Sequence, residues 1–297
     1  MHSLYSGYNR SLRIVPISIF LFLVIYSCKT DPPIYKIHNL NADVISVFGH
    51  AGMGLAFKYP IDTYESIEPV LRIGADGSEM DIQMTKDSVL MIYHHHFIEE
   101  MTLCDPGIIN DKLWSEIWGC HITSPFSSSI RLISFNELMD ELTASGKNIR
   151  DYIYTFDCKL YTNAVDPTPF FNQYANAVLK AIDDYGLQNN ILIESQDTDF
   201  LRIIQNKRSG LKLFIYPASF EDGIQIASEM NLFGITINTN NISADQIELA
   251  HDAGFRVTLW GIGTKQENTD AIQKSPDYIQ TDKPIELLKV FQKYKGF

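Results

Sequence analysis

The sequence contains little cysteine and little positive charge. Only 4 of its 297 residues are cysteine, too few for a small fold held together by disulfides. There are 24 Lys and Arg against 36 Asp and Glu, which gives a net charge of −12, and an acidic surface repels nucleic acid. Internal repeats and low-complexity tracts are absent from the sequence. Its 45% of hydrophobic residues, with 17 Phe and 15 Tyr, is enough for a globular core.

An apolar run near the N-terminus is too short to cross a bilayer as a helix. It covers residues 14–26, which is 13 residues, against the roughly 20 that a span needs. Arg10 and Arg13 precede the run and Ser27-Cys28 follow it, as in a secretory signal. Because Cys28 stands where a bacterial lipobox carries its lipidated cysteine, residues 1–27 are predicted to be a lipoprotein signal peptide. An uncleaved anchor and an ordinary signal peptide are the alternatives.

Cleavage before Cys28 would leave 297 − 27 = 270 residues. The removed segment has two Arg and no acid, so the net charge would become −12 − 2 = −14. Residues 28–43 are predicted to be a tether between membrane and domain. The protein is therefore expected to be exported and lipid-anchored to a bacterial membrane, in the periplasm or at the cell surface.

Three cysteines would remain in the mature chain. In an oxidising compartment Cys104 and Cys120 could pair across a loop. Cys158 lies within a strand pattern and is expected to be buried. An odd number of cysteines prevents all three from pairing within one chain.

Short apolar segments, rich in Val, Ile, Phe and Tyr, alternate with longer helix-like segments after residue 43. The predicted strands are residues 44–48, 77–82, 89–93, 152–156, 191–194, 211–216, 234–237 and 256–260, with 278–280 as a ninth candidate. Helices are predicted at residues 169–185, 197–206, 220–230 and 243–253. This alternation predicts an α/β fold with a parallel sheet, and the strand count favours a TIM (β/α)8 barrel over residues 44–297. Residues 97–132 break the pattern and are predicted to be a small insertion after the third strand.

Acidic, basic and histidine side chains follow or end the first four predicted strands. They are His50, Glu79, Asp81, His94, Asp157 and Lys159. In a barrel, residues at the C-terminal strand ends surround the active site, so these side chains are expected to share one mouth. Glu79 and Asp81 are two residues apart and point to the same face of a strand. Together with Asp157 they offer three hard oxygen ligands, which suit Mg²⁺ or Ca²⁺.

The other three side chains are candidates for proton transfer and anion binding. His50 and His94 can exchange protons near neutral pH, and Lys159 lies on the same face as Asp157. A divalent cation, two imidazoles and a lysine predict phosphoryl chemistry. In it one histidine deprotonates the nucleophile and the other protonates the leaving alcohol.

A series of motifs runs in order over roughly residues 45–290. They are His50-Ala51-Gly52, Pro60-Ile61-Asp62-Thr63, Gly74-Ala75-Asp76-Gly77-Ser78-Glu79-Met80-Asp81, Thr85-Lys86-Asp87, Tyr93-His94-His95, Asp157-Cys158-Lys159, Leu259-Trp260-Gly261-Ile262 and Thr281-Asp282-Lys283-Pro284. These motifs resemble those of the glycerophosphodiester phosphodiesterase family, a group of TIM barrels among the phospholipase-C-like phosphodiesterases.

The resemblance implies hydrolysis of a glycerophosphodiester to glycerol 3-phosphate and an alcohol. It implies that the divalent ion is held by Glu79, Asp81 and Asp157, and that His50 and His94 are the acid and the base. It further implies that Lys159 contacts phosphate and that Trp260 lines the glycerol side of the site. The expected partners are then a small phosphodiester and, through the lipid anchor, a membrane.

The sequence departs from the family pattern close to these residues. Ala51 stands where the family has arginine, Ile61-Asp62 where it has Glu-Asn, His95 where it has aspartate, and Asp157 where it has glutamate. Two alternatives follow from these departures and from the anchor. One is an altered or inactive barrel that binds a phosphorylated ligand, and the other is a phospholipase that acts on intact lipid.

Overall fold

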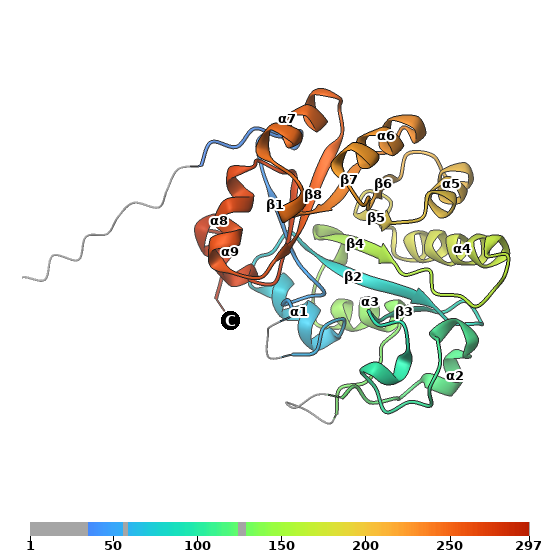
Figure 1. The fold of residues 1–297 in the computed structure, drawn as a ribbon. Helices are drawn as coiled ribbons and strands as arrows, with labels where there is room; N and C mark the ends of the chain where they lie inside the picture. Colours follow the sequence, from blue (N-terminus) through green and yellow to red (C-terminus); the bar gives the residue numbers. More distant parts are fainter. Residues whose placement is uncertain (1–34, 56–58, 124–128, 297) are drawn as a thin grey trace, which may run out of the picture. The chain divides into compact units, whose positions relative to one another are not determined.

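Residues 35–55, 59–123 and 129–296, which the computed structural model describes, contain an eight-stranded parallel barrel surrounded by helices (Figure 1). Its strands are β1 (Ser46–Gly49), β2 (Gly77–Met84), β4 (Ile153–Cys158), β5 (Ile191–Ser195), β6 (Lys212–Ile215), β7 (Gly234–Asn238), β8 (Arg256–Ile262) and β9 (Tyr278–Thr281). Because β1 pairs in parallel with both β2 and β9, the sheet closes on itself. The predicted TIM barrel is confirmed. The predicted signal peptide with Cys28, and most of the predicted tether, lie outside the described residues.

The helices lie outside the barrel, most of them packed on it. They are α1 (Tyr64–Arg72), α2 (Trp114–Ile117), α3 (Phe135–Ala144), α4 (Thr168–Tyr185), α5 (Thr198–Lys207), α6 (Phe220–Met230), α7 (Ala244–Asp252), α8 (Lys265–Gln273) and α9 (Pro284–Val290), with 3₁₀ turns η1 (Ile98–Glu100), η2 (Ile109–Asp111), η3 (Ile149–Asp151) and η4 (Thr239–Asn241). Helix α2 belongs to the segment of residues 97–132. The four predicted helices coincide with α4 to α7 to within one residue. In the part of the chain described here, no helix is both long and apolar enough to cross a membrane.

The third predicted strand is not part of the barrel. It is β3 (Leu90–Ile92), which pairs antiparallel with β2 at the edge of the sheet. Only a tight turn of residues 85–89 joins β2 to β3. In this turn the Thr85 hydroxyl accepts a hydrogen bond from the backbone N–H of Val89 at 3.0 Å. A parallel crossover needs a dozen or more residues, so such a short connection forces an antiparallel pair. The eighth barrel strand is instead β9, predicted only as a ninth candidate.

The segment after β3 forms the predicted insertion, with its own small apolar core. Buried side chains of that core include Tyr93, Ile98, Ile109 and Ile117. A disulfide joins Cys104 to Cys120, whose Cα atoms are 5.6 Å apart, so the pairing that the sequence left open is present in the structure. Cys158 is free and buried in β4, also as predicted.

Aromatic side chains fill the barrel near the N-terminal ends of its strands. Phe48, Leu192, Phe214 and Tyr278 form a buried cluster, with ring centroids 5.4 Å apart for Phe48 and Tyr278. Gly234 makes room for it, because a Cβ there would lie 2.6 Å from the Phe214 ring. The interior is thus closed at one end by apolar packing, and polar side chains gather towards the other.

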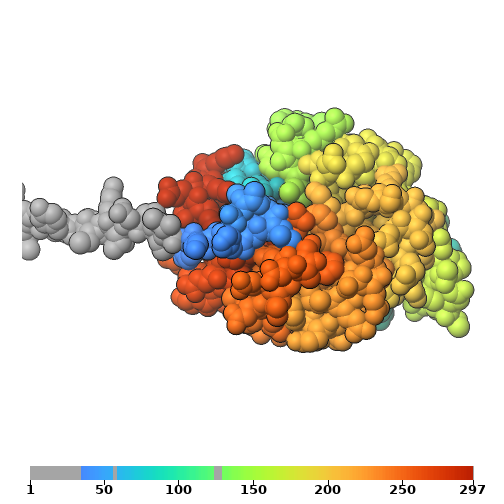
Figure 2. Space-filling view, turned by 90° about the horizontal axis from the view of Figure 1, so that it is seen from above, coloured from blue at the N-terminus to red at the C-terminus, as the bar shows by residue number. Residues whose placement is uncertain are grey.

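The chain before β1 packs against the C-terminal part of the barrel (Figure 2). Asn39 donates to the Pro276 carbonyl at 2.8 Å, and the Leu40 N–H donates to Asp277 at 2.9 Å. Arg256 at the start of β8 donates to Asn41 at 2.9 Å. Although residues 28–43 are predicted as a tether, this part of them is hydrogen-bonded to the barrel.

Candidate active site

Three carboxylates from β2 and β4 converge on one face of the sheet. Asp81 and Asp157 are register partners on these adjacent parallel strands, so their side chains emerge side by side. Glu79 lies two residues earlier on β2 and points to the same face. Ligand oxygens of Glu79, Asp81 and Asp157 all lie within 4.8 Å of one another. The sequence predicted this group, and register between two strands far apart in the chain brings it together.

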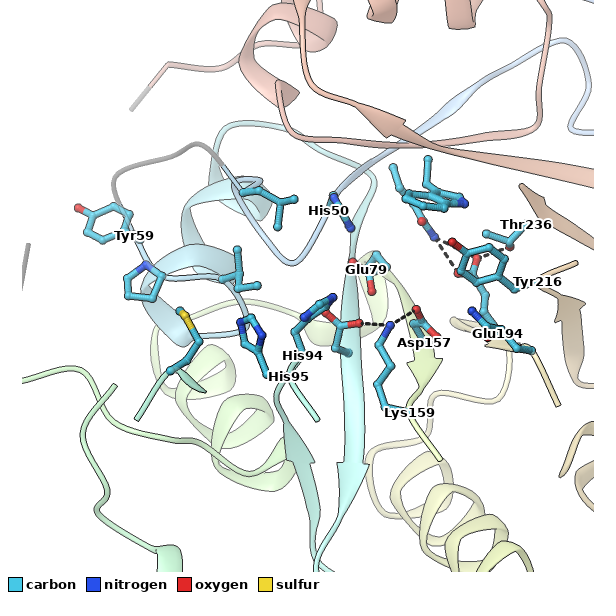
Figure 3. Close-up of a pocket in the computed structure, with 18 of the residues that line it drawn as sticks. His50, Tyr59, Glu79, His94, His95, Asp157, Lys159, Glu194, Tyr216 and Thr236 are labelled. Atoms are coloured by element: carbon cyan, nitrogen blue, oxygen red, sulfur yellow. Dashed lines mark hydrogen bonds and ion pairs between the residues drawn. The ribbon is translucent and has the colours of Figure 1, made fainter. Parts of the chain in front are cut away.

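Lys159 neutralises part of this negative charge. Its ammonium group lies 2.9 Å from Asp81 Oδ1 and 2.7 Å from Asp157 Oδ2 (Figure 3). Burial opposes the charged ammonium, but both carboxylates raise the pKa of Lys159 well above its usual value. Burial likewise raises the pKa of Asp157. For Asp81, the charge of Lys159 overcomes burial and lowers the pKa.

Glu79 is held by the backbone at the end of β1. The N–H of Ala51 donates to Glu79 Oε2 at 2.7 Å. Ala51 is itself fully buried, so the residue that replaces the family's arginine positions a carboxylate with its backbone. Burial and the charge of Asp81 raise the pKa of Glu79 well above its usual value.

His50 follows β1 and is oriented by an aspartate from the other end of the chain. His50 Nδ1 and Asp282 Oδ1 are 2.8 Å apart, and Asp282 comes directly after β9. In Figure 3 the His50 ring points towards Glu79. Burial opposes protonation, but the hydrogen bond with Asp282 and the neighbouring carboxylates raise the pKa of His50 to about 9.

His94 comes from the edge strand and not from the barrel itself. The preceding residue, Tyr93, donates its backbone N–H to the Asp81 carbonyl at 2.8 Å, which fixes His94 beside Asp81. Burial lowers the pKa of His94, and the positive charge of Lys159 acts in the same direction. Nδ1 of His94 has no hydrogen-bond partner among the described residues. The two predicted histidines therefore face the same site with opposite pKa shifts.

Asp62 is a further buried acid. Its Oδ1 accepts the backbone N–H of Asp81 at 3.2 Å. Burial and the charges of Asp81 and Glu79 raise the pKa of Asp62 well above its usual value. Asp62 stands where the family has an amide, and its contact with Asp81 places it beside the three carboxylates.

All seven predicted barrel site residues line one cavity of about 550 Å³. They are His50, Glu79, Asp81, His94, Asp157, Lys159 and Trp260. Trp260 packs edge-on against Tyr216, with ring centroids 5.3 Å apart. His95, the family's aspartate position, also lines the cavity and lies 3.5 Å from Glu100.

Sequence reasoning missed a second polar group in the cavity wall. Glu194 on β5, Thr236 on β7 and Gln280 on β9 line the cavity and are each no more than 3% exposed. Burial raises the pKa of Glu194 to about 8. Glu194 ends the predicted strand 191–194, where a polar side chain indicates a site, but residue spacing does not show which strands contact one another. Asp282 belongs to a family motif, but the motif does not reveal its contact with His50.

The three converging carboxylates fit a divalent cation. Oxygen ligands of Mg²⁺ or Ca²⁺ lie about 2.0–2.6 Å from the ion, so two ligands of one ion are at most about 5 Å apart. The oxygens of Glu79, Asp81 and Asp157 satisfy this limit. Buried carboxylates need neutralisation, and Lys159 directly contacts only Asp81 and Asp157.

Comparisons with known proteins agree with this geometry. Residues 53–286 match the sequence profile of the Glycerophosphoryl diester phosphodiesterase family. A glycerophosphodiester phosphodiesterase of Caldanaerobacter subterraneus subsp. tengcongensis is 22% identical over 244 residues, which are 82% of this chain and 97% of that protein.

Solved structures share the fold. A glycerophosphodiester phosphodiesterase of Parabacteroides distasonis superposes with a TM-score of 0.69 at 17% identity, over 84% of this chain and 97% of that one. A phosphodiesterase of Oleispira antarctica, solved with its product sn-glycerol-3-phosphate, gives a TM-score of 0.72 at 14% identity, over 84% and 98%.

Proposed function

The chain belongs to the glycerophosphoryl diester phosphodiesterase family and is thus a phosphoric diester hydrolase, and we propose that it hydrolyses glycerophosphodiesters to glycerol 3-phosphate and an alcohol. The observation that carries the proposal is the convergence of three carboxylates, two histidines and a lysine on one cavity. The product bound to the Oleispira antarctica phosphodiesterase supports this choice of substrate.

A divalent cation, Mg²⁺ or Ca²⁺, held by Glu79, Asp81 and Asp157 would supply positive charge to the phosphoryl oxygens. Lys159 adds a second positive charge next to Asp157, and we assign it to phosphate binding. Trp260, packed on Tyr216, provides an apolar wall for the carbon atoms of the glycerol.

The two histidines divide the proton transfers. His50, hydrogen-bonded to Asp282 and with a raised pKa, is protonated at neutral pH and can donate a proton to the leaving alcohol oxygen. His94, with a lowered pKa, is neutral and can take a proton from the attacking water. This assignment predicts a bell-shaped pH profile.

The direct test is a substrate and metal panel. The purified protein is incubated with glycerophosphocholine and glycerophosphoethanolamine in the presence of Mg²⁺, Ca²⁺ or a chelator, and release of glycerol 3-phosphate is measured. We expect cation-dependent release, and a loss of at least about 100-fold in Glu79→Gln. The matched control is Glu229→Gln, an exposed glutamate on α6, which should behave as wild type.

Other results would select the alternatives. If no diester is cleaved with any cation and Glu79→Gln binds phosphorylated ligands as wild type does, the barrel is a binding module. If phospholipid vesicles are hydrolysed and soluble diesters are not, the protein is a phospholipase.

We further propose that the protein is exported and anchored to a bacterial membrane through a lipid on Cys28. The signal pattern before Cys28 supports this, and the Cys104–Cys120 disulfide is typical of an oxidising compartment. Metabolic labelling with a radioactive fatty acid should mark the wild-type chain and not Cys28→Ser. Equal labelling of both would contradict the anchor.

A further inference from the structure

A buried polar network lies in the wall of the active-site cavity and takes no part in the chemistry described above. Glu194 Oε1 accepts the Thr236 hydroxyl at 2.7 Å and the Gln280 side-chain amide at 3.0 Å. The same amide lies 3.1 Å from Glu194 Oε2. The three residues come from β5, β7 and β9, so the network spans the inside of the barrel (Figure 3).

A polar network of this kind is unusual inside a barrel of parallel strands. Interiors of these barrels are normally filled by bulky apolar side chains, as Phe48, Leu192, Phe214 and Tyr278 do nearer the N-terminal strand ends. Burying a carboxyl group away from water costs free energy unless hydrogen bonds compensate for it, and here Thr236 and Gln280 supply them. Glu194 is 1% exposed, and its two partners hold the carboxyl group in one orientation at the cavity surface.

The register of the strands places this network next to the cation site. Glu194 is the register partner of Asp157 on the adjacent parallel strand. Adjacent strands are about 4.8 Å apart, and register partners in a parallel sheet point to the same face. A phosphate bound beside Asp157 therefore has Glu194 about one strand spacing away, on the side of the cavity that Tyr216 and Trp260 also line.

We propose that Glu194, held by Thr236 and Gln280, recognises a free hydroxyl group on the carbon next to the phosphate-bearing carbon of the substrate. This proposal rests on the proposed diester hydrolysis, which places the phosphate at the three carboxylates. The hydroxyl on the middle carbon of a glycerophosphodiester is one carbon away from the carbon that bears the ester oxygen, which suits this spacing. The oxygens of the Glu194 carboxyl group can accept a hydrogen bond from such a hydroxyl, and Thr236 and Gln280 hold them in place.

The network would then select deacylated diesters over intact phospholipids. In an intact lipid the middle hydroxyl is esterified to an acyl chain and has no proton to donate. A site built to hydrogen-bond a hydroxyl rejects an analogue without it, because its own buried polar groups are left unpaired. Glu194 would thus be the residue by which the site discriminates a glycerophosphodiester from an analogue without the middle hydroxyl.

The test compares two substrates that differ in this hydroxyl alone. They are glycerophosphocholine and its analogue 3-hydroxypropyl phosphocholine, which lacks the middle hydroxyl. We expect wild type to favour glycerophosphocholine about 100-fold or more in kcat/KM. Glu194→Leu should lower kcat/KM for glycerophosphocholine far more than for the analogue, so that the ratio falls towards one. Glu194→Gln, which keeps an acceptor oxygen, should retain most of the preference.

Two threonine variants control for a purely structural role. Thr236→Val removes a hydroxyl from the network and should reduce the preference. Thr258→Val removes an equally buried strand hydroxyl that has no partner among the described residues, and it should leave the preference unchanged. If Glu194→Leu does not fold, Thr236→Val carries the same comparison. A ratio that is unaltered in the network variants, or a wild type that hydrolyses both substrates equally, would overturn the proposal.

The two proposals fail in different ways. If wild type hydrolyses neither substrate, the proposed function is wrong. Calorimetry with glycerol 3-phosphate and 3-hydroxypropyl phosphate then tests whether the network recognises the hydroxyl. Tighter binding of glycerol 3-phosphate that Glu194→Leu abolishes would support the network's role. Equal binding of the two phosphates, or binding of neither, would contradict it.

Discussion

Replacing Asp282 with asparagine tests how the protein keeps His50 protonated. Asparagine can still accept a hydrogen bond from Nδ1 of a neutral imidazole, but it has no negative charge. The pKa of His50 is raised from 6.5 to about 9, and a single neighbouring carboxylate typically accounts for about 1–3 pKa units. We therefore expect Asp282→Asn to lower the pKa of His50 by about 1.5 units, with the remaining increase due to Glu79 and Asp81.

The change should appear on the alkaline side of the pH profile. With a decrease of about 1.5 units, the protonated fraction of His50 at pH 9 falls from about one half to about 0.03. As the proposed general acid, His50 must be protonated, so kcat/KM at pH 9 should fall about 15-fold while it changes little near pH 6. A bound cation would lower the pKa of His50 in both proteins, so the pH at which the 15-fold difference appears would move down with it, and both profiles are recorded at one cation concentration.

Stability gives a second readout that does not depend on activity. Because the pKa of His50 is higher in the folded than in the unfolded protein, its protonation stabilises the fold fully below pH 6.5, and this stabilisation is lost as pH rises through about 9. A decrease of about 1.5 units corresponds to about 2 kcal/mol. The free energy of unfolding of Asp282→Asn should therefore be lower than that of wild type by about 2 kcal/mol near pH 6, and the difference should vanish above pH 9.

A second histidine–aspartate pair serves as the control. His251 Nε2 and Asp277 Oδ2 are also 2.8 Å apart, but Asp277 precedes β9 and lies at the opposite end of the barrel from the cavity. Asp277→Asn should alter stability and leave the alkaline limb of the kcat/KM profile in place. If Asp282→Asn leaves that limb unmoved or shifts it to higher pH, the proposed role of the His50–Asp282 pair is wrong.

Three further predictions concern the cation site, the insertion and the barrel core. Lys159→Met should make the cation-free protein less stable and increase the rise in melting temperature caused by Ca²⁺ or Mg²⁺, since Asp81 and Asp157 then lack a positive partner; equal shifts in both proteins would contradict this. Cys104→Ser removes a disulfide between residues 16 positions apart, and the free energy of unfolding measured in urea should fall by about 3 kcal/mol. An unchanged free energy of unfolding would show that the disulfide does not stabilise the fold. Phe214→Ala should lower the free energy of unfolding by about 3–5 kcal/mol, and a loss below 1 kcal/mol would show that the aromatic cluster is loosely packed.

Most of the barrel could be predicted because its signal is local. Buried parallel strands read as short apolar runs, and the amphipathic helices between them have clear ends, so α4 to α7 were placed to within one residue. The direction in which a strand pairs with its neighbour cannot be read from the apolar pattern of that strand. Residues 89–93 were predicted as a strand, but only the tight turn at Thr85 shows that β3 runs antiparallel to β2 and lies outside the barrel.

The site was predicted in part for the same reason. The two-residue spacing of Glu79 and Asp81 places both on one face, and the motifs identified His50, His94 and Lys159. The partners of these residues come from other strands. Asp282 reaches His50 from after β9, and Glu194 stands beside Asp157 through strand register.

The amino-acid sequence alone determined the alternation of strands and helices, the family and the identity of the acids and histidines, because each depends on residue type and short spacing. Only the tertiary structure decided which histidine has the raised pKa and that Glu194, Thr236 and Gln280 form one network. Those properties depend on burial and on distances between side chains that lie up to 232 residues apart in the chain, as His50 and Asp282 do. Closure of the barrel, by pairing β1 with β9, is what brings such residues together.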